Sequence, residues 1–410
     1  MTLTGLCRTL APAVLLALAC GDPSGPAASA RLDALPRDLT VAERNLISGS
    51  NAFAFDLLRE LNASQRSENV FISPLSASMA LGMTLNGAEG ETFDAMRNTL
   101  RFGTASREDV NASYRSLIDL LRGLDKSTDF RIANSIWYEK TFPFNASFIS
   151  ESQQFFDAKV TPLDFRDNAS VATINAWVNE ATGKKIPTIV DQISDSTVMY
   201  LIDAIYFKGS WHNRFDKSKT ANAPFFAIDG SSAAVPMMTQ TASLGVAHGS
   251  NYVAVDLPYG NSAYTMTVVL PAEGTDINAF AEGMTLEKWK AIDATLHVGE
   301  TTLFLPRFSV EWKGLLNDAL ADLGMGIAFT SADFSRMSPR GKELVIDKVL
   351  QKTFVDVNEE GTEAAAVTSV EIGVTSAPQP IRVDRPFVFA IRERLSGTIL
   401  FVGKIVRLPA

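Results

Sequence analysis

The sequence predicts an α+β fold, in which helices come first along the chain and strands dominate later. Amphipathic helical patterns are prominent before residue 125, whereas β-branched, strand-like runs are concentrated after residue 198. The two kinds of element do not alternate, so a doubly wound parallel sheet is not predicted. Of the 410 residues, 46% are hydrophobic and 20% charged, which is enough apolar material for a large core in one domain or two.

The helix predictions begin with a capping box. Thr40 and Glu43 have its spacing and are followed by apolar residues at helical period, which predicts a helix to about Asn62. Ser73 as an N-cap, with Pro74 at the first helical position, predicts a second helix that ends at residues 86–87. Further helices are predicted over residues 109–124, 171–182 and 314–323. Strands are predicted over residues 130–138, 198–207, 252–257, 264–270, 301–310, 344–357, 387–391 and 399–406.

The first 20 residues have the pattern of an export signal. One positive charge precedes the apolar run LAPAVLLALA, which is too short to span a bilayer. Cys20 follows a small residue at the end of this run and resembles the lipidated cysteine of bacterial lipoproteins, although Ala17 stands where leucine is usual. The alternative is an ordinary cleaved signal in which Cys20 is incidental. Residues 21–39 are predicted to form a flexible tether and residues 40–410 the folded domain. The expected location is the extracellular space or the cell envelope, with a membrane contact only through a lipid anchor.

The positions of the cysteines and the net charge limit which disulfides and which partners the protein can have. Both cysteines, Cys7 and Cys20, lie in the signal segment, so the mature domain has no disulfide although it is expected in an oxidising space. The formal charge of −9 and the absence of long basic runs argue against nucleic acid as a partner.

The usual catalytic constellations are absent from the sequence. The three histidines, His212, His248 and His297, have no acidic or second histidine neighbour at metal-ligand spacing. No GxSxG motif is present, and the TGKK run at Thr182 lacks the upstream glycine of a phosphate-binding loop. We therefore expect no metal, no cofactor and no enzymatic activity.

The stretch TEAAAVTSVEIG, residues 362–373, alternates with period two. Its even-numbered residues are small or apolar, whereas the odd-numbered ones include Glu363 and Glu371, as in a strand buried on one side. Alanine is a poor residue for an ordinary strand, but small side chains suit a segment that must enter between existing strands. The alternative is a flexible, alanine-rich surface loop.

The run EEGTEAAAVTS resembles the hinge of the reactive loop in serpins, the serine protease inhibitors. Other segments resemble that family in the same order along the chain: NVFISPLSASMALGMTLNGAEGET, LIDAIYFKGSWHNRFD, VDLPYG and VDRPFVFAIRERLSGTILFVGKI. The resemblance extends from about Thr40 to the C-terminus. It implies a helical bundle over three β-sheets with an exposed reactive loop. It also implies a suicide substrate, whose loop is cleaved by a serine protease and then inserts into the main sheet while the acyl-enzyme is trapped.

The resemblance places the scissile bond between Thr375 and Ser376, with the bond from Val374 to Thr375 as the alternative register. The residues before the bond are small or β-branched and uncharged, so an elastase-like or subtilisin-like protease is the expected partner. The implied hinge is compatible with insertion, which favours an inhibitor over a non-inhibitory binding or storage module. Its residues are Glu359, Gly361, Thr362, Glu363, Ala364, Ala365 and Ala366.

Two further regions are implied to control opening of the main sheet. At the breach, where insertion begins, Trp211 matches the family's tryptophan and Arg307 is expected to pair with Glu359. The alternative is that Trp211 is an ordinary core residue and that Arg307 and Glu359 form a surface ion pair worth under about 1 kcal/mol.

At the shutter, near the centre of the sheet, Ser73 and Ser76 match family serines. Asp203 and Gln351 replace the usual asparagine and histidine, so the Gln351 amide is expected to donate to the Asp203 carboxylate. The helix over residues 109–124 has only two arginines, so no heparin-type activator is expected. The inhibitor is expected to be monomeric.

Overall fold

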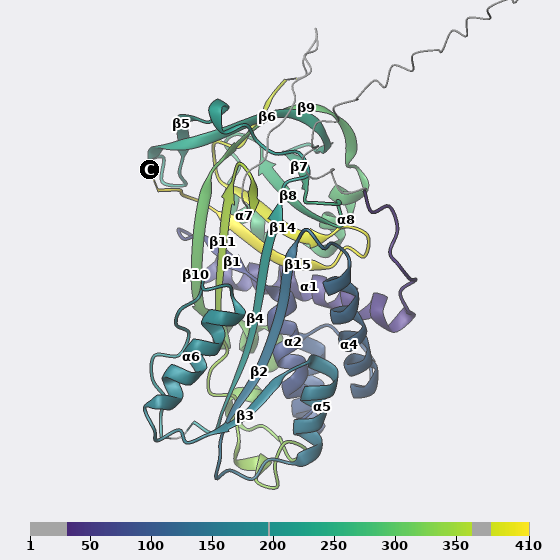
Figure 1. Cartoon of the computed structure of the whole chain (residues 1–410), viewed down its shortest axis with the longest axis vertical. Helices are drawn as coiled ribbons and strands as arrows, with labels where there is room; N and C mark the ends of the chain where they lie inside the picture. The colour runs from purple at the N-terminus through teal and green to yellow at the C-terminus, as the bar shows by residue number, and fades with distance from the viewer. Residues whose placement is uncertain (1–30, 196, 363–378, 410) are drawn as a thin grey trace, which may run out of the picture.

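A computed structural model describes residues 31–195, 197–362 and 379–409, with the backbone but not the side chains of residues 203–205. In this part of the chain, helices pack on two hydrogen-bonded β-sheets (Figure 1). The α-helices are α1 (Val41–Ser64), α2 (Pro74–Leu85), α3 (Gly90–Thr99), α4 (Arg107–Gly123), α5 (Ala146–Phe156), α6 (Ala169–Ala181), α7 (Ile277–Glu282), α8 (Leu286–Ala294), α9 (Asn317–Leu320) and α10 (Ile327–Thr330). Three short turns of other helix types are η1 (Lys217–Lys219), η2 (Ala321–Met325) and η3 (Gly341–Glu343).

The strands are β1 (Val70–Ile72), β2 (Asp129–Glu139), β3 (Lys159–Leu163), β4 (Met199–Ser210), β5 (Ala221–Phe226), β6 (Ser232–His248), β7 (Tyr252–Pro258), β8 (Tyr264–Pro271), β9 (His297–Pro306), β10 (Phe308–Leu315), β11 (Leu350–Asn358), β12 (Gly361–Thr362), β13 (Ile381–Arg382), β14 (Phe387–Glu393) and β15 (Ile399–Ile405).

The six-stranded sheet has the order β10-β11-β12-β4-β2-β3 and is antiparallel except for the β2–β3 pair. It is buried on both faces: in β2, Ile136 belongs to the main core and its neighbour Trp137 to a second cluster under α6. In Figure 1, α6 lies to one side of these long strands, and α2, α4 and α5 lie to the other. Successive side chains of a strand point to opposite faces of the sheet, so neighbouring residues of β2 reach two different cores.

The second sheet has the order β1-β15-β14-β8-β7-β6-β9-β13, with β5 paired to β6. The 17-residue strand β6 pairs with β7 at one end and with β9 and β5 along the rest, so it connects two of the three expected sheets into one hydrogen-bonded unit.

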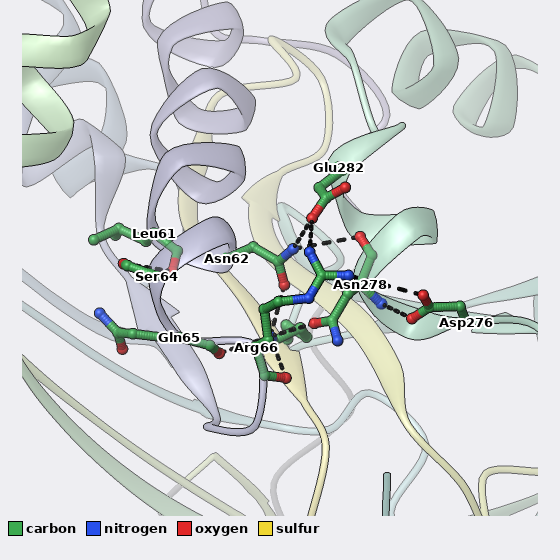
Figure 2. Close-up of polar contacts among 9 residues, drawn as sticks. Leu61, Asn62, Ser64, Gln65, Arg66, Asp276, Asn278 and Glu282 are labelled. Carbon is green, nitrogen blue, oxygen red and sulfur yellow. Dashed lines mark hydrogen bonds and ion pairs between the residues drawn. The ribbon is translucent and has the colours of Figure 1, made fainter.

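Helix α1 begins as predicted and ends in a polar cluster. The Thr40 and Glu43 side chains each accept from the other's backbone N–H, which is a complete capping box. At the other end, the Asn62 amide donates to Glu282 Oε1 at 2.9 Å, and Arg66 donates to the same oxygen at 2.7 Å (Figure 2). The buried Lys404 ammonium of β15 donates to Asn62 Oδ1 at 2.6 Å. This cluster joins α1 to α7 and to the C-terminal strand.

Three predicted boundaries are wrong. The predicted strand 301–310 is two strands, because the chain turns at Arg307 and β10 leaves the sheet of β9 for the other sheet. The predicted helix 314–323 overlaps the end of β10, where Gly314 pairs with Gln351, and a helix begins only at Asn317. The predicted strand 344–357 begins at Leu350.

The residues before α1 were expected to belong to a tether, but those from 31 onward lie against the domain. The side chains of Leu32, Leu35 and Leu39 pack on the core. The Leu32 N–H donates to the Asn261 carbonyl at 2.7 Å, and Arg394 donates to the Leu32 carbonyl. Regular leucines after the glycine- and proline-bearing stretch explain why this part of the chain is packed. No helix in the described ranges is long and apolar enough to cross a bilayer.

Candidate functional site

The expected hinge enters the six-stranded sheet. Strand β12, residues Gly361 and Thr362, lies between β11 and β4 and pairs antiparallel with both. Thr362 is opposite Val357 on one side and Gly209 on the other, and it is only 3% exposed. Two residues of the implied hinge therefore already occupy a strand position between β11 and β4.

Aromatic residues form the floor of this position. The Thr362 and Tyr259 hydroxyls are 2.8 Å apart, and both side chains are buried. Burial raises the pKa of the Tyr259 phenol, so the hydroxyl stays protonated. Trp211 stacks on Tyr259 with ring centroids 4.4 Å apart, and its indole N–H donates to the Asn358 carbonyl at 2.8 Å. Trp211 therefore lies beside the hinge, and its breach role stays a prediction.

Gly361 is required by its geometry. Its φ of +149° is in the region that favours glycine, and a Cβ atom there would lie 2.0 Å from the Gly209 carbonyl oxygen of β4. The close approach of the two backbones lets the hinge enter the sheet beside β4.

Two consecutive carboxylates before Gly361 are held by cations of the surrounding structure. Glu359, whose side chain is 2% exposed, forms the expected ion pair with Arg307 and accepts from Thr220 Oγ1 at 2.7 Å. Glu360 pairs with Lys217 of η1. Burial opposes ionisation of Glu359, but the hydrogen bonds from Arg307 and Thr220 outweigh it and hold the pKa of this carboxyl below its usual value.

At the shutter, the described side chains connect α2 to β11. The Ser73 hydroxyl donates to the Leu400 carbonyl at 2.8 Å. The Gln351 amide donates to the Ser73 carbonyl at 2.8 Å and accepts from the Ser73 N–H at 3.0 Å. Ser76 is buried one turn along α2. The side chain of Asp203 lies outside the described residues, so the expected donation from Gln351 stays a prediction.

The remaining predicted site residues also lie outside the described ranges. They are the scissile pair Thr375 and Ser376, the alternative residue Val374, the hinge residues Glu363, Ala364, Ala365 and Ala366, and the lipidation candidate Cys20. Within the described ranges, no group of three or more His, Cys, Asp and Glu side chains could hold a metal ion.

Sequence reasoning missed three partners of the hinge. Tyr259 lies in the VDLPYG motif, one of the segments whose sequence resembles the serpin family. Because a buried tyrosine hydroxyl needs a polar partner, this motif could have indicated a contact such as the one with Thr362. Lys217 and Thr220 lie in an ordinary polar turn, and nothing in their residue type distinguishes them before the fold brings them to Glu360 and Glu359.

Comparison with known proteins identifies the family. Residues 48–408 match the family model described as Serpin (serine protease inhibitor). The leukocyte elastase inhibitor of Sus scrofa is 36% identical over 376 residues, covering 88% of this chain and 98% of that protein. Native tengpin, a thermophilic serpin, has a TM-score of 0.82 at 31% identity, covering 91% of this chain and 96% of the tengpin chain. A thyroxine-binding globulin in complex with thyroxine has a TM-score of 0.81 at 28% identity, covering 89% of this chain and 100% of the globulin.

The fold and the matching family model define a class of proteins that comprises protease inhibitors and not enzymes. This chain belongs to the serpin family. The expected serpin fold is confirmed by its likeness to solved serpin structures.

Proposed function

We propose that this serpin inhibits extracellular serine proteases as a suicide substrate, with cleavage between Thr375 and Ser376. One observation supports this most directly: β12 already lies between β11 and β4, so insertion would lengthen an existing strand rather than open a closed sheet. The family's inhibitors and the 36% identity to a leukocyte elastase inhibitor support the same function.

The chemistry uses groups that the protease supplies. Its serine attacks the Thr375 carbonyl, the bond to the Ser376 nitrogen breaks, and the protease's general acid protonates that nitrogen as it leaves. The acyl ester joins Thr375 to the protease. The fourteen residues from Thr362 to Thr375 span roughly 45 Å as a strand, so insertion would carry the ester to the far end of the main sheet before water hydrolyses it.

The target follows from the residues before the bond. Ile372, Gly373, Val374 and Thr375 offer no charge to an acidic specificity pocket, and the next basic residue, Arg382, lies well past the bond. We propose an elastase-like or subtilisin-like protease with a shallow or apolar pocket. The adjacent bond, from Val374 to Thr375, would suit the same class.

Incubation with pancreatic elastase, subtilisin and trypsin, followed by SDS gels and mass spectrometry, tests the proposal. We expect an SDS-stable complex with elastase or subtilisin and a released peptide that begins at Ser376. Thr362→Arg should remain cleavable but form little complex, because a long cation does not fit a position that is 3% exposed, whereas Thr362→Ser should keep inhibition. Cleavage of the wild-type chain by every protease without any complex would overturn the proposal.

A second candidate function is small-molecule binding without inhibition. A cavity of about 250 Å³ lies between α1, α8 and the turn after β14, and it is lined by Arg44, Lys290, Arg392 and Arg394 with Trp289. A structural relative is a thyroxine-binding globulin. Quenching of tryptophan fluorescence by thyroxine, in a protein that forms no protease complex, would favour this function.

We also propose that the protein is exported and held at the cell envelope through lipidated Cys20. Wild-type protein should partition into detergent, whereas Cys20→Ser should not. Equal partitioning of the two would favour an ordinary signal peptide.

A further inference from the structure

Arg382 lies where the chain returns from the reactive loop to the nine-stranded sheet. It belongs to β13, which pairs parallel with β9 so that Arg382 is opposite Phe304. The next N–H, of Val383, donates to the Phe304 carbonyl at 2.9 Å. Ile381 and Val383 on either side are buried, whereas Arg382 is exposed. The backbone at this arginine is therefore held by pairing with β9 and by its two buried neighbours.

The side chain of Arg382 is also held in place. Its guanidinium carbon lies 3.8 Å from the centroid of the Phe304 ring, which is stacking distance for a cation–π contact. A stacked guanidinium presents its N–H groups at its edge, in the fork geometry that fits a carboxylate. Among residues 31–195, 197–362 and 379–409, no carboxylate forms an ion pair with Arg382. Within the part of the chain that the structure describes, the contact of this guanidinium is the Phe304 ring.

Threonines lie beside Arg382 on the neighbouring strands, and the nearest charges along its own chain are the Asp384–Arg385 ion pair. On the neighbouring strands, Thr239 is opposite Phe304, and Thr241 is opposite Thr302 with their hydroxyls 2.9 Å apart. The next charged side chain along this face of β9 is Glu300, four residues from Phe304 and roughly 13 Å away. We call these five residues the β9 face: Thr239, Thr241, Thr302, Phe304 and Arg382. It lies at the end of the molecule where β5, β6 and β9 are labelled in Figure 1.

We propose that the β9 face is a docking surface for the target protease, and that Arg382 pairs with an acidic side chain on the protease's prime side. This inference rests on the proposed function. Arg382 lies six residues after Ser376, a reach of at most about 20 Å, whereas even a small domain is about 30 Å across. A protease bound at the scissile bond must therefore lie over or beside the β9 face.

A charge at the edge of such a contact acts mainly on the rate of association. Opposite charges steer the encounter of two proteins, and the gain falls as salt screens them. Because Phe304 already restricts the guanidinium, less side-chain entropy is lost when it binds a carboxylate. Arg382 would thus select, among proteases with suitable pockets, those with an acidic prime-side rim.

The test uses a charge swap with the full-length exported protein. The probe is subtilisin with two aspartates added to its prime-side rim, beside a second version with lysines at the same positions. We expect Arg382→Glu to slow covalent complex formation with the aspartate version by about tenfold at low salt and to speed it with the lysine version. The rate of complex formation of Arg382→Gln should lie between those of wild type and Arg382→Glu with each subtilisin. The differences should largely disappear in 0.5 M salt, because the screening length is then only about 4 Å.

Arg131→Gln is the matched control. Arg131 also lies over an aromatic ring, that of Tyr206, but it is on β2 of the other sheet and pairs with Asp129. Arg131→Gln should leave the association rates with both subtilisins unchanged. As a control for folding, the unfolding midpoint of Arg382→Glu should match that of wild type. Equal rates for wild type and Arg382→Glu with both subtilisins, while complexes still form, would overturn this inference alone. Failure of wild type to form any complex would overturn the proposed function and this inference with it.

Discussion

The Tyr259 hydroxyl lies 2.8 Å from the Thr362 hydroxyl, directly under the point where the hinge enters the six-stranded sheet. Both side chains are buried, so each hydroxyl depends on the other for a hydrogen bond that water would otherwise supply. The same Tyr259 ring stacks on Trp211, which bonds to the chain just before the hinge. The first residue of the inserting segment is therefore held by a specific contact as well as by strand pairing.

Removing the phenol tests this contact. Tyr259→Phe should lower the free energy of unfolding by about 1 kcal/mol, because the Thr362 hydroxyl loses its buried partner. Thr362→Val in the Tyr259→Phe background should cost less than it does in wild type, because the hydroxyl is already unpaired there. Urea unfolding of the four proteins gives the coupling. Strictly additive effects would show that the bond does not stabilise the hinge.

Gly361 offers a sharper perturbation of the same position. We expect Gly361→Ala to lower the free energy of unfolding by more than about 2 kcal/mol, because the new methyl group would lie 2.0 Å from the Gly209 oxygen in a backbone conformation that alanine rarely adopts. Gly397→Ala is the control: φ is +74° there, but nothing lies within 4 Å of the added atom. It should cost about 1 kcal/mol. Equal unfolding midpoints for the two variants would contradict the role of the close approach.

The sequence could predict where the hinge begins because the run EEGTEAAAVTS is a compact motif whose pattern is local. Arg307 and Glu359 could be paired only through the family resemblance, since 52 residues separate them. The pairing of Lys217 with Glu360 was not predicted, because the sequence around an exposed lysine in a turn does not indicate which carboxylate it will contact. The strand boundaries near Arg307 were wrong for a related reason. Apolar residues, Leu305 and Phe308 among them, stand on both sides of the turn, and only tertiary pairing shows that β9 and β10 belong to different sheets.

The packed segment before α1 leads to a prediction about acid stability. Arg37 donates to both oxygens of the buried Glu43, at 2.6 and 3.0 Å. Burial disfavours the charged form of Glu43, but the hydrogen bonds from Arg37, Ser116 and Thr40 outweigh it and lower its pKa to about 2. A carboxyl with a lowered pKa stabilises the folded state above its unfolded pKa of 4.5, and this stabilisation is lost as the pH falls toward 2.

Arg37→Ala should therefore lower the free energy of unfolding by about 1–3 kcal/mol at pH 7, and the difference from wild type should shrink as the pH falls below 4.5. Urea midpoints between pH 3 and pH 7 measure both effects. Arg31→Ala, which removes only an exposed pair with Asp33, should differ little from wild type at any pH. A difference for Arg37→Ala that is constant with pH would rule out the linkage to Glu43.

Lys404 predicts a second rise of stability with pH, at the alkaline end. Its buried ammonium donates to Asn62, to Asn278 Oδ1 at 2.9 Å and to the Gln65 carbonyl at 3.0 Å, next to the Arg66 and Glu282 side chains of Figure 2. None of these direct acceptors is a carboxylate. Burial, with a smaller contribution from the nearby Arg66 charge, lowers the pKa of Lys404 to about 8.

The sign follows from proton counting. Below pH 8 the lysine is charged in both states, and the folded protein is at its least stable with respect to this group. Between pH 8 and the unfolded pKa of 10.5, the unfolded chain binds the proton and the folded protein does not, so the stability contributed by this group rises with pH.

Lys404→Met keeps the volume of the side chain but removes the titration. We expect it to be less stable than wild type at pH 7, since buried oxygens of Asn62 and Asn278 lose their donor. The gap should then widen from pH 8 to pH 10.5, because only wild type gains stability there. Lys313→Met, at an exposed pair with Asp191, controls for the loss of a lysine charge. Parallel pH profiles for wild type and Lys404→Met would mean that Lys404 keeps its proton in the folded protein. Its four oxygen acceptors would then compensate fully for burial of the charge.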